Sequence, residues 1–207
     1  MRIKVNYFDL GVHRGEGIQR VLNELGNDKR FNLNIYGIEA NPEMCRFVSK
    51  RFIKDGRVKI INKAISEIKE DVNLYMSIEA HRQGSSIYRD KYNVTDEFVT
   101  IPTMRLSEII NPIKEDGQVD IIKANIEGAE YDLVKDLKEN NLLSFFDIYF
   151  GPRGNWYTDI MKVASLVDKK GFLEQALKDA GVVINRFAIR DSQAVSVKQK
   201  LLEFIEK

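Results

Sequence analysis

The sequence contains a single cysteine, Cys45, which excludes an intrachain disulfide. It has no apolar run long enough to span a bilayer, and its first residues enter a strand without the apolar core of a signal peptide. The chain also lacks a large net charge of either sign, because its 32 Lys and Arg residues nearly cancel its 31 Asp and Glu residues. We therefore expect a cytoplasmic protein without a membrane span. Nucleic acid is a disfavoured partner, although overall charge does not exclude a local basic groove.

Low-complexity segments and obvious repeats are absent as well. Hydrophobic residues make up 43% of the chain and charged residues 30%, which is an ordinary globular composition. A chain of 207 residues can bury one substantial core. We expect a single ordered domain over residues 1–207.

The spacing of apolar residues switches repeatedly between periods of two and of 3.6, which is typical of alternating strands and helices. This pattern favours an α/β fold with a doubly wound, mostly parallel sheet and helices on both faces. Helices are predicted around Ile18–Leu25, Met44–Phe52, Glu130–Leu137, Ile160–Val167 and Leu201–Ile205. The seven predicted strands of the sheet are Val5–Asp9, Leu33–Glu39, Val58–Asn62, Asp120–Ile126, Phe145–Phe150, Val182–Ala188 and its candidate partner Ala194–Val197.

The regular alternation breaks after the third of these strands. Two further strands, Val72–Ser77 and Phe98–Met104, bracket a polar segment over residues 81–92. Such a long connection inside a compact domain is usually functional or mobile. We interpret residues 72–104 as a β insertion on the substrate side.

A glycine-punctuated turn follows the first predicted strand, with the pattern Asp9-x-Gly11-x-x-x-Gly15. Glycines at such a turn leave room for a ligand beside the start of the next helix, although they also permit close packing of helix and strand. Glu39, at the end of the second strand, is suited to accept both hydrogen bonds of a ribose diol. Because the glycine spacing and the position of Glu39 differ from those of a nicotinamide dinucleotide site, a mononucleoside ligand is the better interpretation.

A second strand-to-helix turn, at residues 123–130, is crowded with acidic and amide side chains. Together with the first turn and with Glu39-Ala40-Asn41-Pro42, it resembles the motifs of the FkbM family of S-adenosylmethionine-dependent methyltransferases. Segments 62–66, 84–87 and 101–106 are also similar to that family, so the resemblance covers roughly Tyr7 to Leu137. It implies a Rossmann-like methyltransferase sheet with S-adenosylmethionine as cofactor.

The resemblance also implies roles for individual residues. The amino acid end of the cofactor would lie over Gly11–Gly15 with its ammonium near Asp9, and Glu39 would take the ribose hydroxyls. Adenine would lie against Ala40 and the turn 64–66, and Asn125 would face the methyl group and the substrate. The predicted cofactor-binding residues are Asp9, Gly11, His13, Gly15, Glu39, Ala40, Ala64, Ile65, Ser66 and Asn125.

Asn125 departs from the family pattern, which has aspartate at this position. An amide is neither a base nor an anionic metal ligand, so metal dependence stays open and no metal site is predicted. We predict Glu127, His81 and Asn125 as catalytic residues, with Glu127 as the first candidate for the base and His81 as the second. Both have a structural alternative. Glu127 lies at a helix start, where the helix dipole favours acids, and His81 is equally consistent with a solvated surface histidine.

Substrate-binding residues are predicted in the insertion and after the fifth strand. The insertion interleaves basic and aromatic side chains, an arrangement that suits a sugar, an acidic metabolite or a nucleic acid strand. Trp156 either stacks on a substrate ring or pins its loop to the core. The predicted substrate-binding residues are Arg82, Ser85, Ser86, Arg153 and Trp156.

Three functions follow from these observations. The first is methylation of a hydroxyl on a sugar, a glycolipid or another small natural product. The second is a methyltransferase that acts on nucleic acid or protein, and the third is a binding module that has kept the nucleoside pocket and lost transfer. The acceptor and the oligomeric state do not follow from the sequence.

Overall fold

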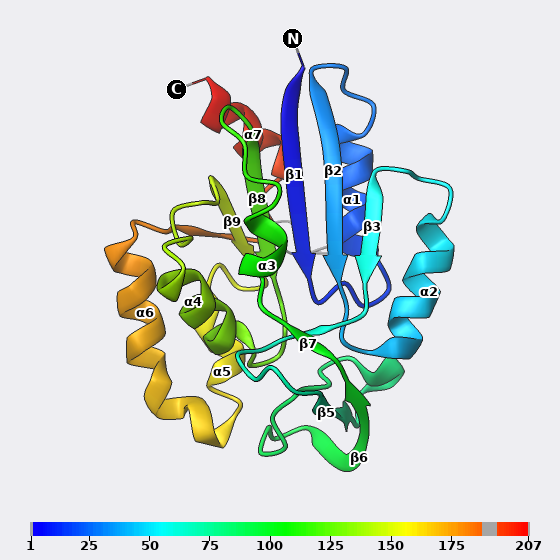
Figure 1. The fold of residues 1–207 in the computed structure, drawn as a ribbon, viewed down its shortest axis with the longest axis vertical. Coiled ribbons are helices and arrows are strands. Elements are labelled where there is room, and N and C mark those ends of the chain that lie inside the picture. Colours follow the sequence, from blue (N-terminus) through cyan, green and yellow to red (C-terminus); the bar gives the residue numbers. More distant parts are fainter. Residues whose placement is uncertain (1, 188–193, 207) are drawn as a thin grey trace.

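A computed structural model describes residues 2–187 and 194–206. Its centre is a parallel sheet with the strand order β10-β9-β8-β1-β2-β3. The chain first builds β1, β2 and β3 outward and then returns to place β8 on the other side of β1, so the order of strands switches between β1 and β8 (Figure 1). The six strands are β1 (Ile3–Leu10), β2 (Phe31–Ile38), β3 (Val58–Ile61), β8 (Val119–Ala124), β9 (Ile148–Gly151) and β10 (Ile184–Arg186).

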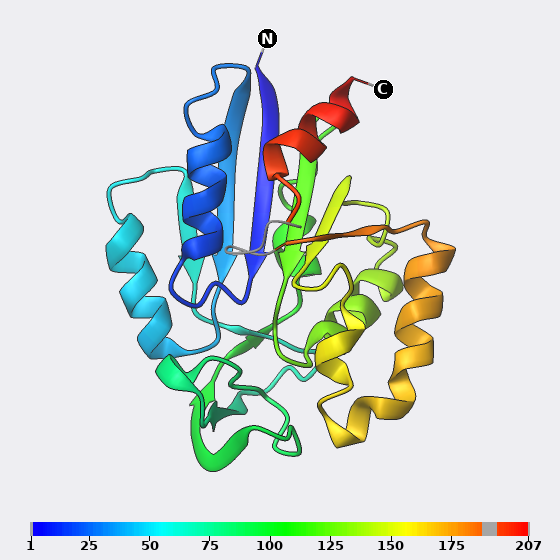
Figure 2. The same ribbon diagram turned by 180° about the vertical axis from the view of Figure 1, so that it is seen from behind.

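Helices cover both faces of this sheet, as the apolar pattern predicted. In β1, Val5 and Tyr7 point to one apolar core, while Phe8 and Leu10 point to the other. The first core, seen from behind in Figure 2, is closed by α1 (Glu16–Leu25), α2 (Pro42–Phe52) and α7 (Val197–Ile205). The second is closed by α3 (Ser107–Ile110), α4 (Glu130–Glu139), α5 (Tyr157–Ile160) and α6 (Lys170–Asp179).

The prediction of a seventh strand at Ala194–Val197 is wrong for these residues. Residues 194–196 have no regular structure, and Val197 is the first residue of α7. The Ser196 side chain accepts a hydrogen bond from the Gln199 backbone N–H, so serine acts here as a helix cap. The sheet within the described residues therefore has six strands; Ala188, the predicted end of the preceding strand, lies outside them.

The single helix predicted around Ile160–Val167 is also wrong. The short α5 ends at Ile160, and a 3-10 turn, η2, covers Ala164–Lys169. The longer helix of this region, α6, was not predicted. Its buried residues Leu173, Ala176 and Leu177 have the i, i+3, i+4 spacing that would have indicated it.

The insertion lies at the carboxyl ends of the sheet strands (Figure 1). It contains β5 (Val72–Ser77), η1 (Ala80–Arg82), β6 (Val94–Ile101) and β7 (Thr103–Met104), and the short strand β4 (Ala64–Ile65) precedes it. The strand β5 has the predicted bounds, but Phe98–Met104 is divided between two sheets. The division falls at Pro102, which has no N–H for a continuous ladder. β6 pairs antiparallel with β5, and β7 pairs parallel with β4.

None of the helices within residues 2–187 and 194–206 is long and apolar enough to cross a membrane.

Candidate functional site

An open cavity lies at the carboxyl ends of β1, β2 and β8. Ligands of doubly wound sheets bind at this edge, at the point where the strand order reverses. The insertion supplies the opposite wall. Predicted site residues that line the cavity are Gly11, His13, Glu39, Ala40, Ala64, Ile65, Arg82, Ser85, Ser86, Asn125 and Glu127.

Gly11 lies where the turns after β1 and β8 touch. Its φ is 78°, and a Cβ atom placed on it would lie 1.9 Å from the backbone oxygen of Asn125. The Gly11 N–H donates to the Ile38 carbonyl oxygen at 2.9 Å, and the Asn125 N–H donates to the Leu10 carbonyl oxygen at 3.0 Å. The requirement for glycine is therefore both conformational and steric.

Glu39 follows β2, and its carboxylate is buried in the cavity wall. One carboxylate oxygen accepts the His13 N–H at 2.7 Å and the other accepts the Asn41 N–H at 2.9 Å. Burial raises the pKa of Glu39, while these two backbone donors oppose the rise. The carboxylate joins the turn after β1 to the start of α2 and keeps further lone pairs for a ligand.

Asp9 does not line the cavity. Its side chain is fully buried behind the turn, where Oδ1 accepts from the Lys123 ammonium at 2.8 Å. The same ammonium donates to the Gly11 carbonyl oxygen at 2.9 Å. Oδ2 of Asp9 has no hydrogen-bond partner among the described residues. Asp9 is thus placed to support the shape of the turn through Lys123, and a direct contact with a cofactor ammonium stays a prediction.

Gly15 and Ser66 also lie behind the cavity wall. Gly15 precedes α1 with a φ of 82°, and a Cβ there would lie 2.6 Å from the Phe52 ring. The Ser66 hydroxyl donates to the Asp132 carboxylate at 3.0 Å. Both residues fix the elements that carry the wall, and neither contributes to its lining.

Asn125 lies at the junction of the main cavity and a second, more open one. The second cavity lies over the turn after β1, and Gly11, His13, Lys123 and His81 also contribute to it. The Asn125 side chain makes no hydrogen bond within the described residues, so its amide is free to contact a ligand in either cavity. This is the place that the resemblance implies for the reacting groups.

The two histidines come together above the turn. His81 is exposed, with a φ of 56°. Burial lowers the pKa of His13, and a hydrogen bond with the His81 backbone opposes this change. The insertion therefore contacts the turn after β1, and both histidines line the second cavity.

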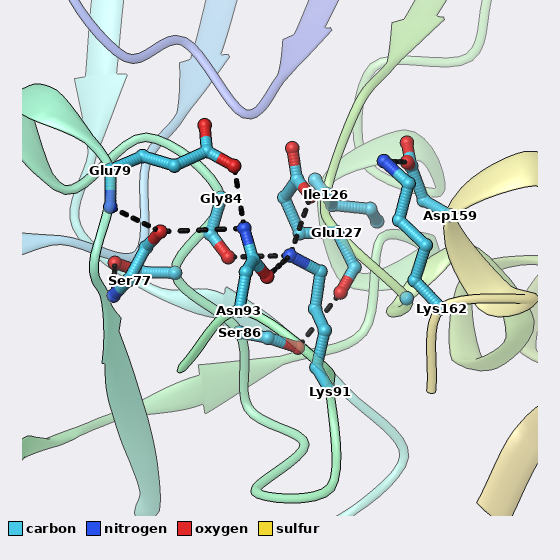
Figure 3. Close-up of polar contacts among 12 residues, drawn as sticks. Ser77, Glu79, Gly84, Ser86, Lys91, Asn93, Ile126, Glu127, Asp159 and Lys162 are labelled. Atoms are coloured by element: carbon cyan, nitrogen blue, oxygen red, sulfur yellow. Dashed lines mark hydrogen bonds and ion pairs between the residues drawn. The ribbon is translucent and has the colours of Figure 1, made fainter. Parts of the chain in front are cut away.

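Glu127 has the left-handed φ of 58°, which is uncommon for a residue other than glycine. Its carboxylate forms an ion pair with Lys91 of the insertion at 3.0 Å, and its carbonyl oxygen accepts the Ser86 hydroxyl at 2.8 Å (Figure 3). The first candidate for the base is therefore held by the insertion on two sides.

Glu130 holds the backbone of the turn after β8, which carries Glu127, and its side chain does not line the cavity. Its carboxylate accepts the Ile126 N–H at 2.7 Å and the Gly128 N–H at 2.8 Å. Burial, together with the nearby Asp159, raises the pKa of Glu130 to about 8. A role in shaping the turn fits this position better than proton transfer to a ligand.

We expect the raised pKa of Glu130 to make stability depend on pH. Between its ordinary value of 4.5 and about 8, the folded protein retains a proton that the unfolded chain releases, so the free energy of unfolding should fall as pH rises through this window. Glu130→Gln cannot ionise and should reduce that slope. Urea denaturation of both proteins at pH 5, 6.5 and 8 measures it; equal slopes would contradict the assignment.

The predicted substrate residues of the insertion line the cavity, but their side chains already make hydrogen bonds to other residues of the protein. The Ser85 hydroxyl donates to the Arg82 carbonyl oxygen at 2.7 Å and accepts the Ser77 N–H at 3.0 Å. The Arg82 guanidinium donates to Glu97 at 2.8 Å. These side chains shape the wall, and their contact with a substrate stays a prediction.

Trp156 does not reach the rim. Its side chain is buried, and its indole N–H donates to the Phe150 carbonyl oxygen at 2.9 Å. The structure thus favours the second of the two interpretations, in which the tryptophan pins its loop to the core. Arg153, in the same loop, is exposed and lines neither cavity.

Sequence reasoning missed Lys91. Lys91 belongs to the polar segment of the insertion, yet its side chain is completely buried beside Glu127. No periodic pattern marks it, because the segment that carries it is irregular. Met44 and Leu74 of the cavity wall were likewise not singled out.

The model of the methyltransferase FkbM domain matches residues 9–181 of the chain. The chain belongs to the FkbM methyltransferase family. This FkbM domain is also similar to the crystal structure of methyltransferase FkbM from Methylobacillus flagellatus KT, with 15% identity and a TM-score of 0.47. The similarity covers 86% of this chain and 40% of that one, so the domain spans less than half of that protein's length. No curated protein matches it.

Proposed function

We propose that this methyltransferase uses S-adenosylmethionine and transfers the methyl group to a hydroxyl of a sugar, a glycolipid or another small natural product. The observation that carries the proposal is the cavity at the reversal of strand order, which has a buried carboxylate, Glu39, in one wall and Asn125 with Glu127 in another. Membership of a methyltransferase family supports it.

The residues present fit the cofactor. Gly11 has no room for a side chain, so only backbone lies between its turn and the end of β8. Both oxygens of the Glu39 carboxylate are fixed by backbone N–H groups, so its position is set before a ribose diol arrives. The adjoining wall is apolar where an adenine ring would lie, with Ala40, Ile65 and Met44.

The bound cofactor would supply a methyl group activated by the positively charged sulfur, which would leave as a neutral thioether when a hydroxyl oxygen bonds to the methyl carbon. Orientation contributes much of the rate of such a reaction, and a rigid wall supplies it. Glu39 would hold the ribose, Gly11 would allow the close approach of the turn, and Asn125 would orient the acceptor through its amide. Glu127 would accept the proton of the hydroxyl.

The charges of the insertion favour a small acceptor over nucleic acid. Arg82 is paired with Glu97 at 2.8 Å, Arg89 with Asp96 at 2.9 Å, and Lys91 is buried. Each basic side chain of this segment therefore faces a carboxylate and leaves little net charge for phosphates. A gel shift that weakens with salt would favour the nucleic acid alternative.

Calorimetry tests the proposal directly. Titration of the protein with S-adenosylmethionine should give saturable binding with one site per chain, and absence of heat would overturn the use of this cofactor. Transfer of a labelled methyl group to a panel of sugars and polyols then separates enzyme from binding module. If the cofactor binds without turnover on any acceptor and Asn125→Asp restores turnover, the binding module is the correct function.

A further inference from the structure

Lys91, in the connection between β5 and β6, is a lysine with no exposed side-chain surface. Its ammonium contacts Glu127 Oε2 at 3.0 Å, the Gly84 carbonyl oxygen at 2.7 Å and Asn93 Oδ1 at 2.5 Å (Figure 3). A buried ammonium is costly unless it is paired and hydrogen-bonded, and here it has three partners. The insertion thus directs one fixed positive charge at Glu127.

The backbone around Glu127 is fixed just as firmly. Ser86 binds the Glu127 carbonyl oxygen, and Glu130 binds the N–H groups on either side, at Ile126 and Gly128. These contacts maintain a left-handed backbone at Glu127, where φ is 58°. Such a conformation is unfavourable for glutamate and persists where the surrounding structure imposes it, commonly at a functional site.

The Glu127 carboxylate is asymmetric in its contacts. Oε2 faces Lys91, whereas Oε1 makes no hydrogen bond with any residue that the structure describes and points away from Lys91 (Figure 3). The side chain is 17% exposed and lines the cavity beside Asn125. One oxygen is therefore occupied by the lysine and the other is available to a ligand.

We propose that Lys91 is a positioning residue that binds Glu127 Oε2 and so directs Oε1 at the cavity to take the proton of the acceptor hydroxyl. The inference rests on the proposed function. As the bond between the acceptor oxygen and the methyl carbon forms, the bond between that carbon and the cofactor sulfur breaks, and the sulfur loses its positive charge. The proton leaves the acceptor oxygen for Glu127 Oε1.

Other ionisable groups surround this pair. Lys162, bonded to Asp159 at 2.6 Å, adds a second positive charge toward Glu127. Glu130 lies below the turn, and Glu79 is linked to Lys91 through Asn93. Lys91 alone among these side chains contacts the Glu127 carboxylate within the described residues, so its removal should have the largest effect.

A stability cycle tests the contact without any assay of activity. Lys91→Met leaves the half-buried Glu127 carboxylate without its positive partner and should lower the free energy of unfolding. Adding Glu127→Gln removes that unpaired charge. The double variant should therefore lose less unfolding free energy than the two single variants lose together. Urea denaturation of the four proteins measures this coupling. Additive effects would overturn the pairing.

The pH profile of methyl transfer tests the role. In Lys91→Met, the acid limb of kcat/KM should move to higher pH by about one unit, because a half-buried carboxylate that has lost its positive partner holds its proton more tightly. Lys91→Arg should restore most of the original limb, and Glu127→Gln should lose roughly 100-fold at every pH. Lys162→Met, which removes a nearby charge that does not contact Glu127, is the matched control and should move the limb less.

The outcomes separate this inference from the proposed function. A wild-type protein that binds no S-adenosylmethionine overturns the proposed function, and the proton-accepting role of Glu127 with it. If the wild type binds and turns over while Lys91→Met keeps the original pH profile, only the role of Lys91 is overturned. Lys91 is not among the residues that line the cavity, so Lys91→Met should bind the cofactor as the wild type does.

Discussion

Replacing Gly11 with alanine should weaken binding of S-adenosylmethionine at least about tenfold and also destabilise the fold. The new Cβ would lie 1.9 Å from the Asn125 carbonyl oxygen, so the turn after β1 or the end of β8 must move. A left-handed alanine and a steric clash together cost about 2–5 kcal/mol. Calorimetry measures the binding, and thermal unfolding measures the stability.

Gly117→Ala is the matched control for this change. Gly117 has nearly the same φ, 77°, but a Cβ there would meet no atom within 4 Å. The control therefore carries the conformational cost alone, about 1–2 kcal/mol, and should bind the cofactor normally. If Gly11→Ala behaves like Gly117→Ala in both measurements, the turn after β1 does not form the cofactor site.

Glu39→Ala should reduce both cofactor affinity and stability. The two backbone N–H groups of His13 and Asn41 would lose their buried acceptor, and the ribose hydroxyls would lose theirs. An unmade hydrogen bond to a charged group costs about 1–3 kcal/mol, which corresponds to roughly 5- to 150-fold weaker binding. Titration calorimetry and urea denaturation measure the two effects separately.

The neighbouring Glu43→Ala provides the comparison, since Glu43 is an exposed acid in the first turn of α2 and does not line the cavity. It should leave binding unchanged. Glu39→Gln is informative as well, because its amide keeps one acceptor oxygen and should lose less stability than alanine. Normal binding by Glu39→Ala would show that the ribose is not recognised at the end of β2.

The parts of the fold that the sequence predicted are those whose local signals agree with the tertiary structure. Asparagine followed by proline is a typical start of a helix, and the Asn41 side chain caps α2 by accepting the Glu43 N–H at 2.9 Å. The alternation of strands and helices likewise led to the parallel sheet. The errors at Ile160–Val167 and Ala194–Val197 fall where elements are short and packing decides the conformation.

The candidate site was predictable to the extent that it lies at strand ends. Gly11, Glu39 and Asn125 each follow a core strand, and parallel strands bring their carboxyl ends to one edge of the sheet. The orientation of a side chain was not predictable in the same way. Trp156 points into the core and Lys91 is buried against Glu127, because contacts distant in the sequence determine where these side chains lie.

The parallel pair of β4 and β7 gives the insertion adjacent points of departure and return. The Ala64 N–H donates to the Pro102 carbonyl oxygen at 2.9 Å, and the Ser66 N–H donates to Met104 at 3.1 Å. Because β4 and β7 hold the two ends of the insertion together, a longer or different segment between them adds little to the entropic cost of loop closure. If the insertion selects the acceptor, as the proposed function implies, we expect that a hairpin exchanged between β4 and β7 will change acceptor preference, provided that it keeps Ser86 and Lys91, which contact Glu127.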